Sequence, residues 1–214
     1  MQSRIATILF SIHCLVTAGA VACSTAKPEA QKPPLLAASP TPNITQSNAP
    51  SSSIRSVDFA NFTYSWTADL GDPKKTFALR KGEFPPTRNE RGLVQGMGVS
   101  LERVEYGDVT GDGQEEAIVV LSILTGGSAA PHVIYVYARG GDQTSLLWSG
   151  STDDRADGGL QKVYAQNGQL VVERFSPIGK KGDCCPTRFT RTRFEWRGHR
   201  FHRKGKEETL PIPD

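Results

Sequence analysis

With 214 residues and 37% hydrophobic residues, the chain has room for one domain with appendages and is too short for two sizeable cores. Its formal net charge of +3 is mild, so charge gives no global reason to expect a nucleic-acid partner, and we expect none. The 21 glycines and 14 prolines predict many turns and linkers.

Residues 1–22 have the pattern of a bacterial signal peptide. A short basic stretch, Met1–Arg4, is followed by the mostly apolar run Ile5–Val21 and by small residues up to Cys23. This order predicts an exported protein. An uncleaved anchor is the alternative, because the apolar run is near the lower length limit for spanning a bilayer.

The sequence AVAC at Ala20–Cys23 fits two cleavage reactions. It resembles a lipobox, which implies that Cys23 carries acyl chains, including palmitate, and becomes the first mature residue. Two or more acyl chains are enough for stable membrane anchoring. Ser24 is not the aspartate associated with inner-membrane retention, which favours the outer membrane, facing the periplasm, in a Gram-negative host. Ala20-Val21-Ala22 also satisfies the A-x-A rule of ordinary signal peptidase, which would release a soluble secreted protein.

Residues 23–54 are predicted to be a lipid-anchored, disordered linker. Proline, serine, alanine and threonine dominate this stretch, and it has too few large apolar residues to bury a core. A β-rich exported domain is expected over residues 55–214, with the last roughly ten residues as a tail.

Alternating or β-branched apolar runs predict strands at residues 62–66, 98–106, 116–124, 132–138 and 145–148. The run at 116–124 is nearly continuous, as expected of a strand buried on both faces. Hairpins are predicted at 160–175, around Asn167-Gly168, and at 188–202, near Arg197-Gly198.

Residues 72–83 predict one short helix, and no block of the sequence repeats. The expected fold class is therefore mainly β: a single antiparallel β-sheet or sandwich-like domain with one core and at most one or two short helices.

The stretch GDVTGDGQEE, residues 107–116, has the spacing of a calcium-binding loop. Oxygen-bearing side chains recur at alternate positions: Asp108, Thr110, Asp112, Gln114 and Glu116. Val119 stands where an EF-hand needs a bidentate glutamate, so an EF-hand is excluded. The stretch resembles the calcium loops of integrin-type FG-GAP repeats, which implies Ca²⁺ as a cofactor. Two alternatives are a structural turn capped by its aspartates and a catalytic pair of carboxylates.

Cys184 and Cys185 are adjacent and are the only cysteines left in the domain after export. Neighbouring Cα atoms lie about 3.8 Å apart, closer than the usual range for a disulfide, so a bond between them is strained. An oxidising compartment favours such a vicinal disulfide. A redox-active pair and a metal site with His199 and His202 are the alternatives.

The single GDVTGDGQEEAIVVL stretch, followed late in the chain by CCPTRFTRTRFEW, resembles the LppP/LprE type of small bacterial lipoprotein. The likeness covers residues 98–201. It implies an exported lipoprotein with a β-rich fold and supplies no catalytic residues.

Arginines dominate the last predicted hairpin. By strand parity Arg191, Arg193, Arg197 and Arg200 form a basic surface suited to anionic lipids, envelope polymers or an envelope protein; the alternative is an ordinary solvated face. The sequence thus predicts a lipid-anchored envelope protein whose non-catalytic β-domain serves binding or structure. The alternative is a hydrolase dependent on calcium or carboxylates, in which acids of residues 151–159 join Asp112 in a cleft.

Overall fold

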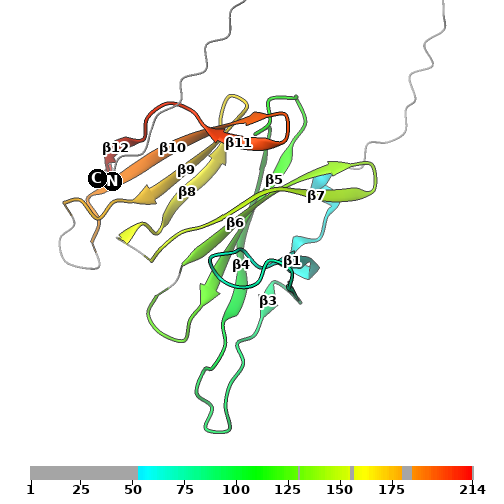
Figure 1. The fold of residues 1–214 in the computed structure, drawn as a ribbon, viewed down its shortest axis with the longest axis vertical. Helices are drawn as coiled ribbons and strands as arrows, with labels where there is room; N and C mark the ends of the chain where they lie inside the picture. Colours follow the sequence, from blue (N-terminus) through cyan, green and yellow to red (C-terminus); the bar gives the residue numbers. More distant parts are fainter. Residues whose placement is uncertain (1–52, 130, 155–156, 180–184, 214) are drawn as a thin grey trace, which may run out of the picture. The chain divides into compact units, whose positions relative to one another are not determined.

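The computed structural model describes residues 53–129, 131–154, 157–179 and 185–213. The predicted signal peptide, Cys23 and nearly all of the predicted linker lie outside these residues. The fold is mainly β, as predicted, and its strands form antiparallel sheets (Figure 1). Within the described ranges, no helix has the length and apolarity needed to cross a bilayer.

The largest part of the fold is a five-stranded sheet, here the central sheet, with the order β3-β4-β5-β6-β7. Its strands are β3 (Glu83–Phe84), β4 (Gly98–Gly107), β5 (Glu116–Leu124), β6 (His132–Gly140) and β7 (Gln143–Ser151). Each strand pairs with its neighbour in sequence, so the sheet is a meander built from local connections. The predicted strands at 98–106, 116–124, 132–138 and 145–148 are all confirmed.

A second five-stranded sheet, here the C-terminal sheet, has the order β11-β10-β9-β8, and β12 also pairs with β10. Its strands are β8 (Leu160–Ala165), β9 (Gln169–Phe175), β10 (Arg188–Arg197), β11 (Arg200–Arg203) and β12 (Glu208–Pro211). Both predicted hairpins are confirmed. At the first, Asn167 and Gly168 have φ values of 53° and 69°, the left-handed backbone that a tight two-residue hairpin turn needs.

The N-terminal part contributes two short 3-10 helices, η1 (Ile54–Ser56) and η2 (Phe59–Asn61), and a two-stranded sheet of β1 (Thr63–Ser65) and β2 (Thr76–Ala78). The helix predicted within 72–83 is wrong. Phe77 and Leu79 are both buried and lie two residues apart, which is the period of a strand. Strand β2 pairs with β1, with Phe77 opposite Tyr64, and this pairing outweighs the weak local preference of residues 72–83 for a helix.

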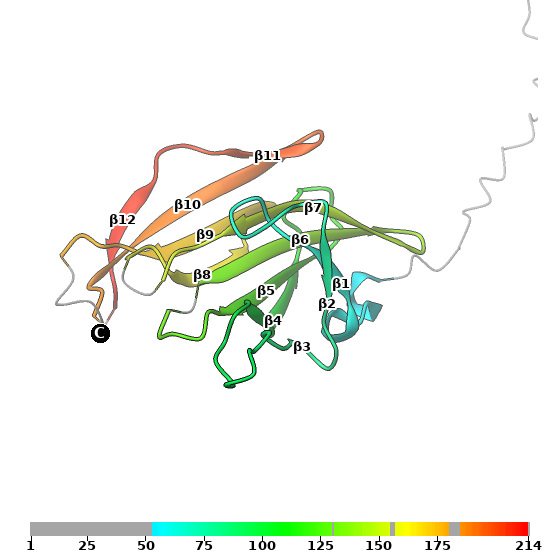
Figure 2. The ribbon, with the colours of Figure 1, turned by 60° about the horizontal axis from the view of Figure 1, so that its bottom comes forward.

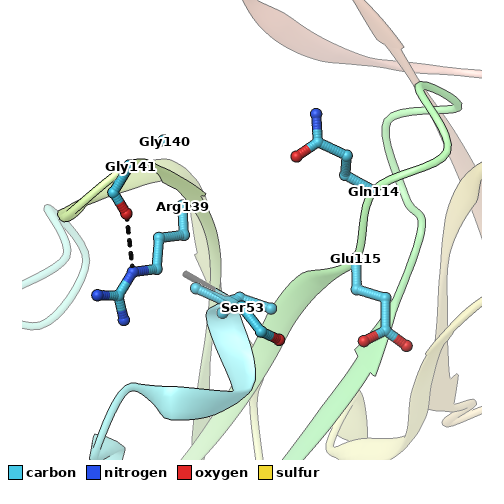
Figure 3. A pocket seen from close by; sticks show the side chains of 7 residues that line it. Ser53, Gln114, Glu115, Arg139, Gly140 and Gly141 are labelled. Atoms are coloured by element: carbon cyan, nitrogen blue, oxygen red, sulfur yellow. Dashed lines mark hydrogen bonds between the residues drawn. The ribbon is translucent and has the colours of Figure 1, made fainter. Parts of the chain in front are cut away.

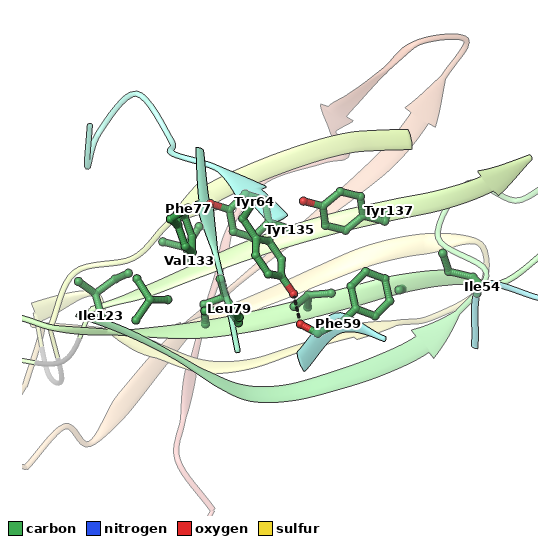
Figure 4. Packing of buried hydrophobic residues seen from close by; sticks show 13 residues of the cluster. Ile54, Phe59, Tyr64, Phe77, Leu79, Ile123, Val133, Tyr135 and Tyr137 are labelled. Atoms are coloured by element: carbon green, nitrogen blue, oxygen red, sulfur yellow. Dashed lines mark hydrogen bonds between the residues drawn. The ribbon is translucent and has the colours of Figure 1, made fainter. Parts of the chain in front are cut away.

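Instead of the single core expected, two hydrophobic clusters cover the two faces of the central sheet. The first joins the N-terminal part to one face and contains Ile54, Phe59, Tyr64, Phe77, Leu79, Val99, Ala117, Val119, Leu121, Ile123, Val133, Tyr135 and Tyr137 (Figure 4). The second joins the C-terminal sheet to the other face and contains Val109, Ile118, Val120, Ile134, Val136, Leu160, Val163, Leu170 and Val172. In Figure 2 the C-terminal strands β10 and β11 are seen above β5 and β6 of the central sheet.

Strand β5 shows why its apolar run is continuous. Its odd-numbered residues from Ala117 to Ile123 belong to the first cluster, and its even-numbered residues Ile118 and Val120 belong to the second. Side chains of a strand alternate between faces, so a strand with both faces covered needs apolar residues at every position. The prediction that residues 116–124 form a strand buried on both faces is confirmed.

The two large sheets are in close contact near the end of β4. A Cβ placed on Gly107 would lie 2.5 Å from the Cβ of Ala165, at the end of β8. Close by, a Cβ on Gly168 would lie 3.0 Å from the Cα of Gly111. The β4–β5 loop is therefore packed against the β8–β9 turn, and this contact positions the aspartate loop.

Candidate functional site

The aspartate loop, residues 108–115, connects β4 to β5 and is organised by the carboxylate of Asp108. The backbone N–H groups of Thr110 and Gly111 donate to its Oδ1 at 3.2 and 2.5 Å, and that of Gly113 donates to its Oδ2 at 3.0 Å. Gly111 and Gly113 have φ values of 79° and 84°, which the turn requires. The Asp108 side chain thus accepts hydrogen bonds from three backbone N–H groups that have no acceptor in a neighbouring strand.

Glu116, the first residue of β5, closes the loop from the inside. Its side chain is buried, its Oε2 accepts a hydrogen bond from the Val109 N–H at 3.0 Å, and its Oε1 accepts one from the Thr110 hydroxyl at 3.5 Å. Burial raises the pKa of Glu116, the Val109 N–H opposes that rise, and the negative charges of Asp112 and Asp108 add to it. The carboxylate is therefore a structural acceptor in a site that disfavours its charge.

The five predicted calcium ligands do not share one role. Asp108 accepts from the backbone of residues 110, 111 and 113, and Glu116 accepts from the Val109 N–H and the Thr110 hydroxyl. Asp112 is exposed, and its Oδ1 accepts from the Gln114 N–H at 2.8 Å. The Gln114 side chain lines a separate cavity (Figure 3). Among the described residues, no three His, Cys, Asp or Glu side chains form a group that could hold a metal ion. Calcium binding stays a prediction, and the arrangement seen is that of the capped structural turn.

Asp108→Ala is expected to destabilise the protein by about 2 kcal/mol, because three backbone donors lose their acceptor together. Asp112→Ala, the matched control in the same loop, should cost less than about 1 kcal/mol, since one exposed hydrogen bond is lost. Urea denaturation of both variants measures the difference. Equal costs would show that Asp108 does not organise the loop, and a stabilisation by millimolar calcium that Asp112→Ala abolishes would restore the calcium site.

The acids of residues 151–159 do not join the aspartate loop. They precede β8, whereas Gly107 and the loop lie at the far end of that strand, beside Ala165. The two ends of β8 are about 16 Å apart at the usual rise of an extended strand. Asp112 and the acids Asp153 and Asp157 are therefore separated by the length of the strand, and the cleft expected for a hydrolase using these acids is not formed among the described residues.

The predicted vicinal disulfide lies at the edge of the described residues. Cys184 is outside them, and Cys185 is exposed and is the first described residue of the segment that leads into β10. The disulfide therefore stays a prediction.

The predicted basic surface does gather on one face of the C-terminal sheet. Arg191 and Arg193 alternate along β10 with residues that face the second cluster, and Arg197 is paired directly opposite Arg200 of β11. Lys204 follows β11, and its backbone N–H donates to the Arg193 carbonyl at 2.8 Å. We call Arg191, Arg193, Arg197, Arg200 and Lys204 the basic face.

Glutamates on the same side pair with most of these cations. Arg191 contacts Glu173 at 2.7 Å and Glu208 at 3.8 Å, and Arg193 contacts Glu208 at 2.5 Å. Glu195 is shared between Arg197 and Lys204, with 3.4 Å to the Lys204 Nζ. Arg200 Nε donates to the His202 Nε2 at 3.0 Å.

Only the Glu173 carboxylate is largely buried; it also accepts from the Tyr164 hydroxyl at 3.0 Å. Its hydrogen bond raises the pKa of the Arg191 guanidinium, and burial together with the same carboxylate raises the pKa of Tyr164. Glu195 has a lowered pKa because Arg197 donates to it. The five cations of the basic face thus meet three carboxylates, Glu173, Glu195 and Glu208, which leaves an excess of two positive charges.

Two cavities contain residues that the sequence did not single out. The first, of about 330 Å³, lies between the start of the described domain, the β4–β5 loop and the β6–β7 turn (Figure 3). There the Arg139 Nε donates to the Gly141 carbonyl at 3.1 Å, and the Arg139 Nη1 donates to the Ser56 hydroxyl at 2.8 Å.

The second cavity, of about 250 Å³, is lined by Val172, Arg174, Thr192, Phe194, Arg203 and Glu207. The sequence contains one sign of this cavity: polar and apolar residues alternate in position so that both kinds share one face of β9 and β10. That signal does not show that the residues meet.

Comparison with protein-family models, with curated proteins and with solved structures found no match to this chain. The assignment of a role therefore rests on the chain's own residues and their arrangement.

Proposed function

We propose that this protein is a lipid-anchored, exported envelope protein whose β-domain binds phosphate-bearing anionic surfaces through the basic face. The observation that carries the proposal is the gathering of five cations on one side of the C-terminal sheet with only three carboxylates to balance them. The proposed role is binding, without a chemical step.

Arginine suits this role because its planar guanidinium matches the oxygens of a phosphate and keeps its charge at any physiological pH. Arg197 and Arg200 lie opposite each other beside the turn of the β10–β11 hairpin, and both are exposed. Like charges in directly opposite positions repel each other. An anionic ligand that contacts both guanidiniums relieves this repulsion, so the hairpin end is the expected centre of contact.

The N-terminal sequence supplies the proposed anchor. The proposed lipid on Cys23 and the following linker would hold the domain close to a membrane surface. A flexible linker of roughly 30 residues has a root-mean-square span of about 30 Å, which lets the basic face reach headgroups or nearby polymers. The resemblance to LppP/LprE lipoproteins belongs to the same proposal.

Arg197→Gln/Arg200→Gln is expected to weaken binding of the non-acylated chain from Ser24 onward to anionic phospholipid vesicles by about tenfold or more. The reason is that each cation near an anionic surface contributes about 1 kcal/mol. Vesicle sedimentation measures the affinity, with zwitterionic vesicles as a blank and a soluble polyphosphate as the polymer arm. Lys74→Gln/Lys75→Gln, an equal charge change at exposed positions of the β1–β2 connection, is the matched control.

An equal loss of affinity in the control would mean that net charge alone is responsible, and the basic face would lose its role. Competition of polyphosphate with vesicles would identify phosphate as the shared recognition element. The mass of the mature N-terminus, measured on the full chain after expression and purification from membranes, shows whether Cys23 carries acyl chains.

A further inference from the structure

The cavity lined by Val172 and Phe194 lies on the face of the C-terminal sheet opposite the basic face. Along β10 the cavity residues Thr192 and Phe194 alternate with Arg191 and Arg193. Val172 belongs to the cluster that joins the two large sheets, and Phe194 packs against it. Within the sheet Thr192 pairs with Val172, so the cavity floor is formed by neighbouring strands β9 and β10. It therefore has an apolar floor beside the central sheet.

Two guanidiniums and a hydroxyl are placed around this floor. Arg174 pairs with Thr190 across β9 and β10, and Arg203 pairs with Phe194 across β10 and β11. Both arginines therefore share the face of Thr192 and lie on either side of it along the sheet.

A carboxylate already occupies part of the cavity wall. The Thr192 hydroxyl donates to Glu207 Oε2 at 2.9 Å, and the Arg203 Nη2 donates to the same oxygen at 2.8 Å. Glu207 comes from the loop between β11 and β12, and its side chain is 41% exposed. These contacts show that Thr192 and Arg203 can bind a carboxylate. Glu207, which provides that carboxylate, is partly exposed and does not belong to a strand.

Arg174 is the cation that Glu207 leaves unbalanced. Its guanidinium is partly buried, and its Nη2 donates to the neutral carbonyl oxygen of Ser151, in β7, at 3.2 Å. Among the residues that the structure describes, no carboxylate lies within ion-pair distance of Arg174. Two guanidiniums and one carboxylate leave the cavity with an excess positive charge, and a partly buried cation is stabilised by an anionic partner.

We propose that this cavity is a binding site for a small organic carboxylate with an apolar body. The carboxylate of the ligand is bound by Arg174 and competes with Glu207 for Arg203 and Thr192, while the body lies on Val172 and Phe194. The volume of about 250 Å³ is below that of sites for drug-sized ligands, so the ligand is a small molecule. This site is independent of the basic face on the other side of the sheet.

Titration calorimetry of the full chain with benzoate tests the site, with benzamide as the neutral probe of the same shape. Saturable binding of benzoate and at least about tenfold weaker binding of benzamide are expected, because charge-assisted hydrogen bonds fix the carboxylate. Glu207→Gln should tighten benzoate binding by about fivefold or more, since it removes a competing negative charge, and Arg174→Gln should weaken it by about tenfold.

Lys74→Gln, which removes an exposed cation from the β1–β2 connection, is the matched control and should leave benzoate affinity unchanged. Three results would overturn the proposal. These are equal binding of benzamide and benzoate, a benzoate affinity that Glu207→Gln leaves unchanged or weakens, and no saturable binding of benzoate to the full chain or to Glu207→Gln. If Arg174→Gln does not fold, the Glu207→Gln result decides, because Glu207 lies in an exposed loop.

Discussion

Tyr64→Ala is expected to lower the free energy of unfolding by about 3–5 kcal/mol, the usual cost of removing a large side chain from a packed core. Tyr64 is fully buried, and its ring lies 5.3 Å from that of Tyr135 and 5.6 Å from that of Phe77. These rings join the N-terminal part to the central sheet, so the cavity left by the substitution opens the contact between them. Urea denaturation followed by tryptophan fluorescence measures the loss.

Tyr64→Phe separates packing from hydrogen bonding in the same position. The Tyr64 hydroxyl donates to the Phe59 carbonyl at 2.7 Å inside the cluster (Figure 4). Removing the hydroxyl alone leaves that carbonyl without its donor and should cost about 1–2 kcal/mol. A cost below about 1 kcal/mol for Tyr64→Ala would mean that the N-terminal part contributes little to the stability of the domain.

Gly107→Ala is expected to cost about 1–3 kcal/mol, because it overpacks a close contact between the two large sheets. The new methyl group would lie 2.5 Å from the Cβ of Ala165, so one strand has to move. Adding Ala165→Gly to the same chain removes the opposing methyl group and should restore most of the stability. Thermal and urea denaturation of the single and double variants give both values.

Gly140→Ala, in β6, is the control for the loss of glycine from a strand. A Cβ at Gly140 meets no atom within 4 Å, so the change should cost less than about 1 kcal/mol. A failure of Ala165→Gly to compensate for Gly107→Ala would show that the cost arises within β4, and the sheets would not depend on this contact.

The contact at Gly107 also bears on the aspartate loop, because it places that loop against the β8–β9 turn. Asp108 and Glu116 then have a defined structural task, which is to satisfy backbone donors and a hydroxyl where β4 ends and β5 begins. In a loop held this way, the carboxylates already have partners without an ion. The alternating oxygens here accompany a tight turn that has hydrogen bonds of its own, and calcium binding to the loop stays a prediction.

The sequence by itself determined the features that depend on neighbouring residues. The β-branched run of β5 and the Asn167-Gly168 turn are encoded within a few residues, so strand and hairpin positions could be predicted closely. Strand parity also placed Arg191, Arg193 and the cations near Arg197 on one face, because alternation is a property of any strand.

The tertiary structure alone decided which surfaces meet. The pairing of β1 with β2, the division into two clusters, the burial of Glu116 and the glutamates opposite the basic face all depend on contacts between distant segments. The cavity between Arg174 and Arg203 also depends on such contacts, because its lining residues come from β9, β10, β11 and the loop that follows β11. Such contacts are set by how whole sheets pack and in what register, and no local pattern of residues contains that information.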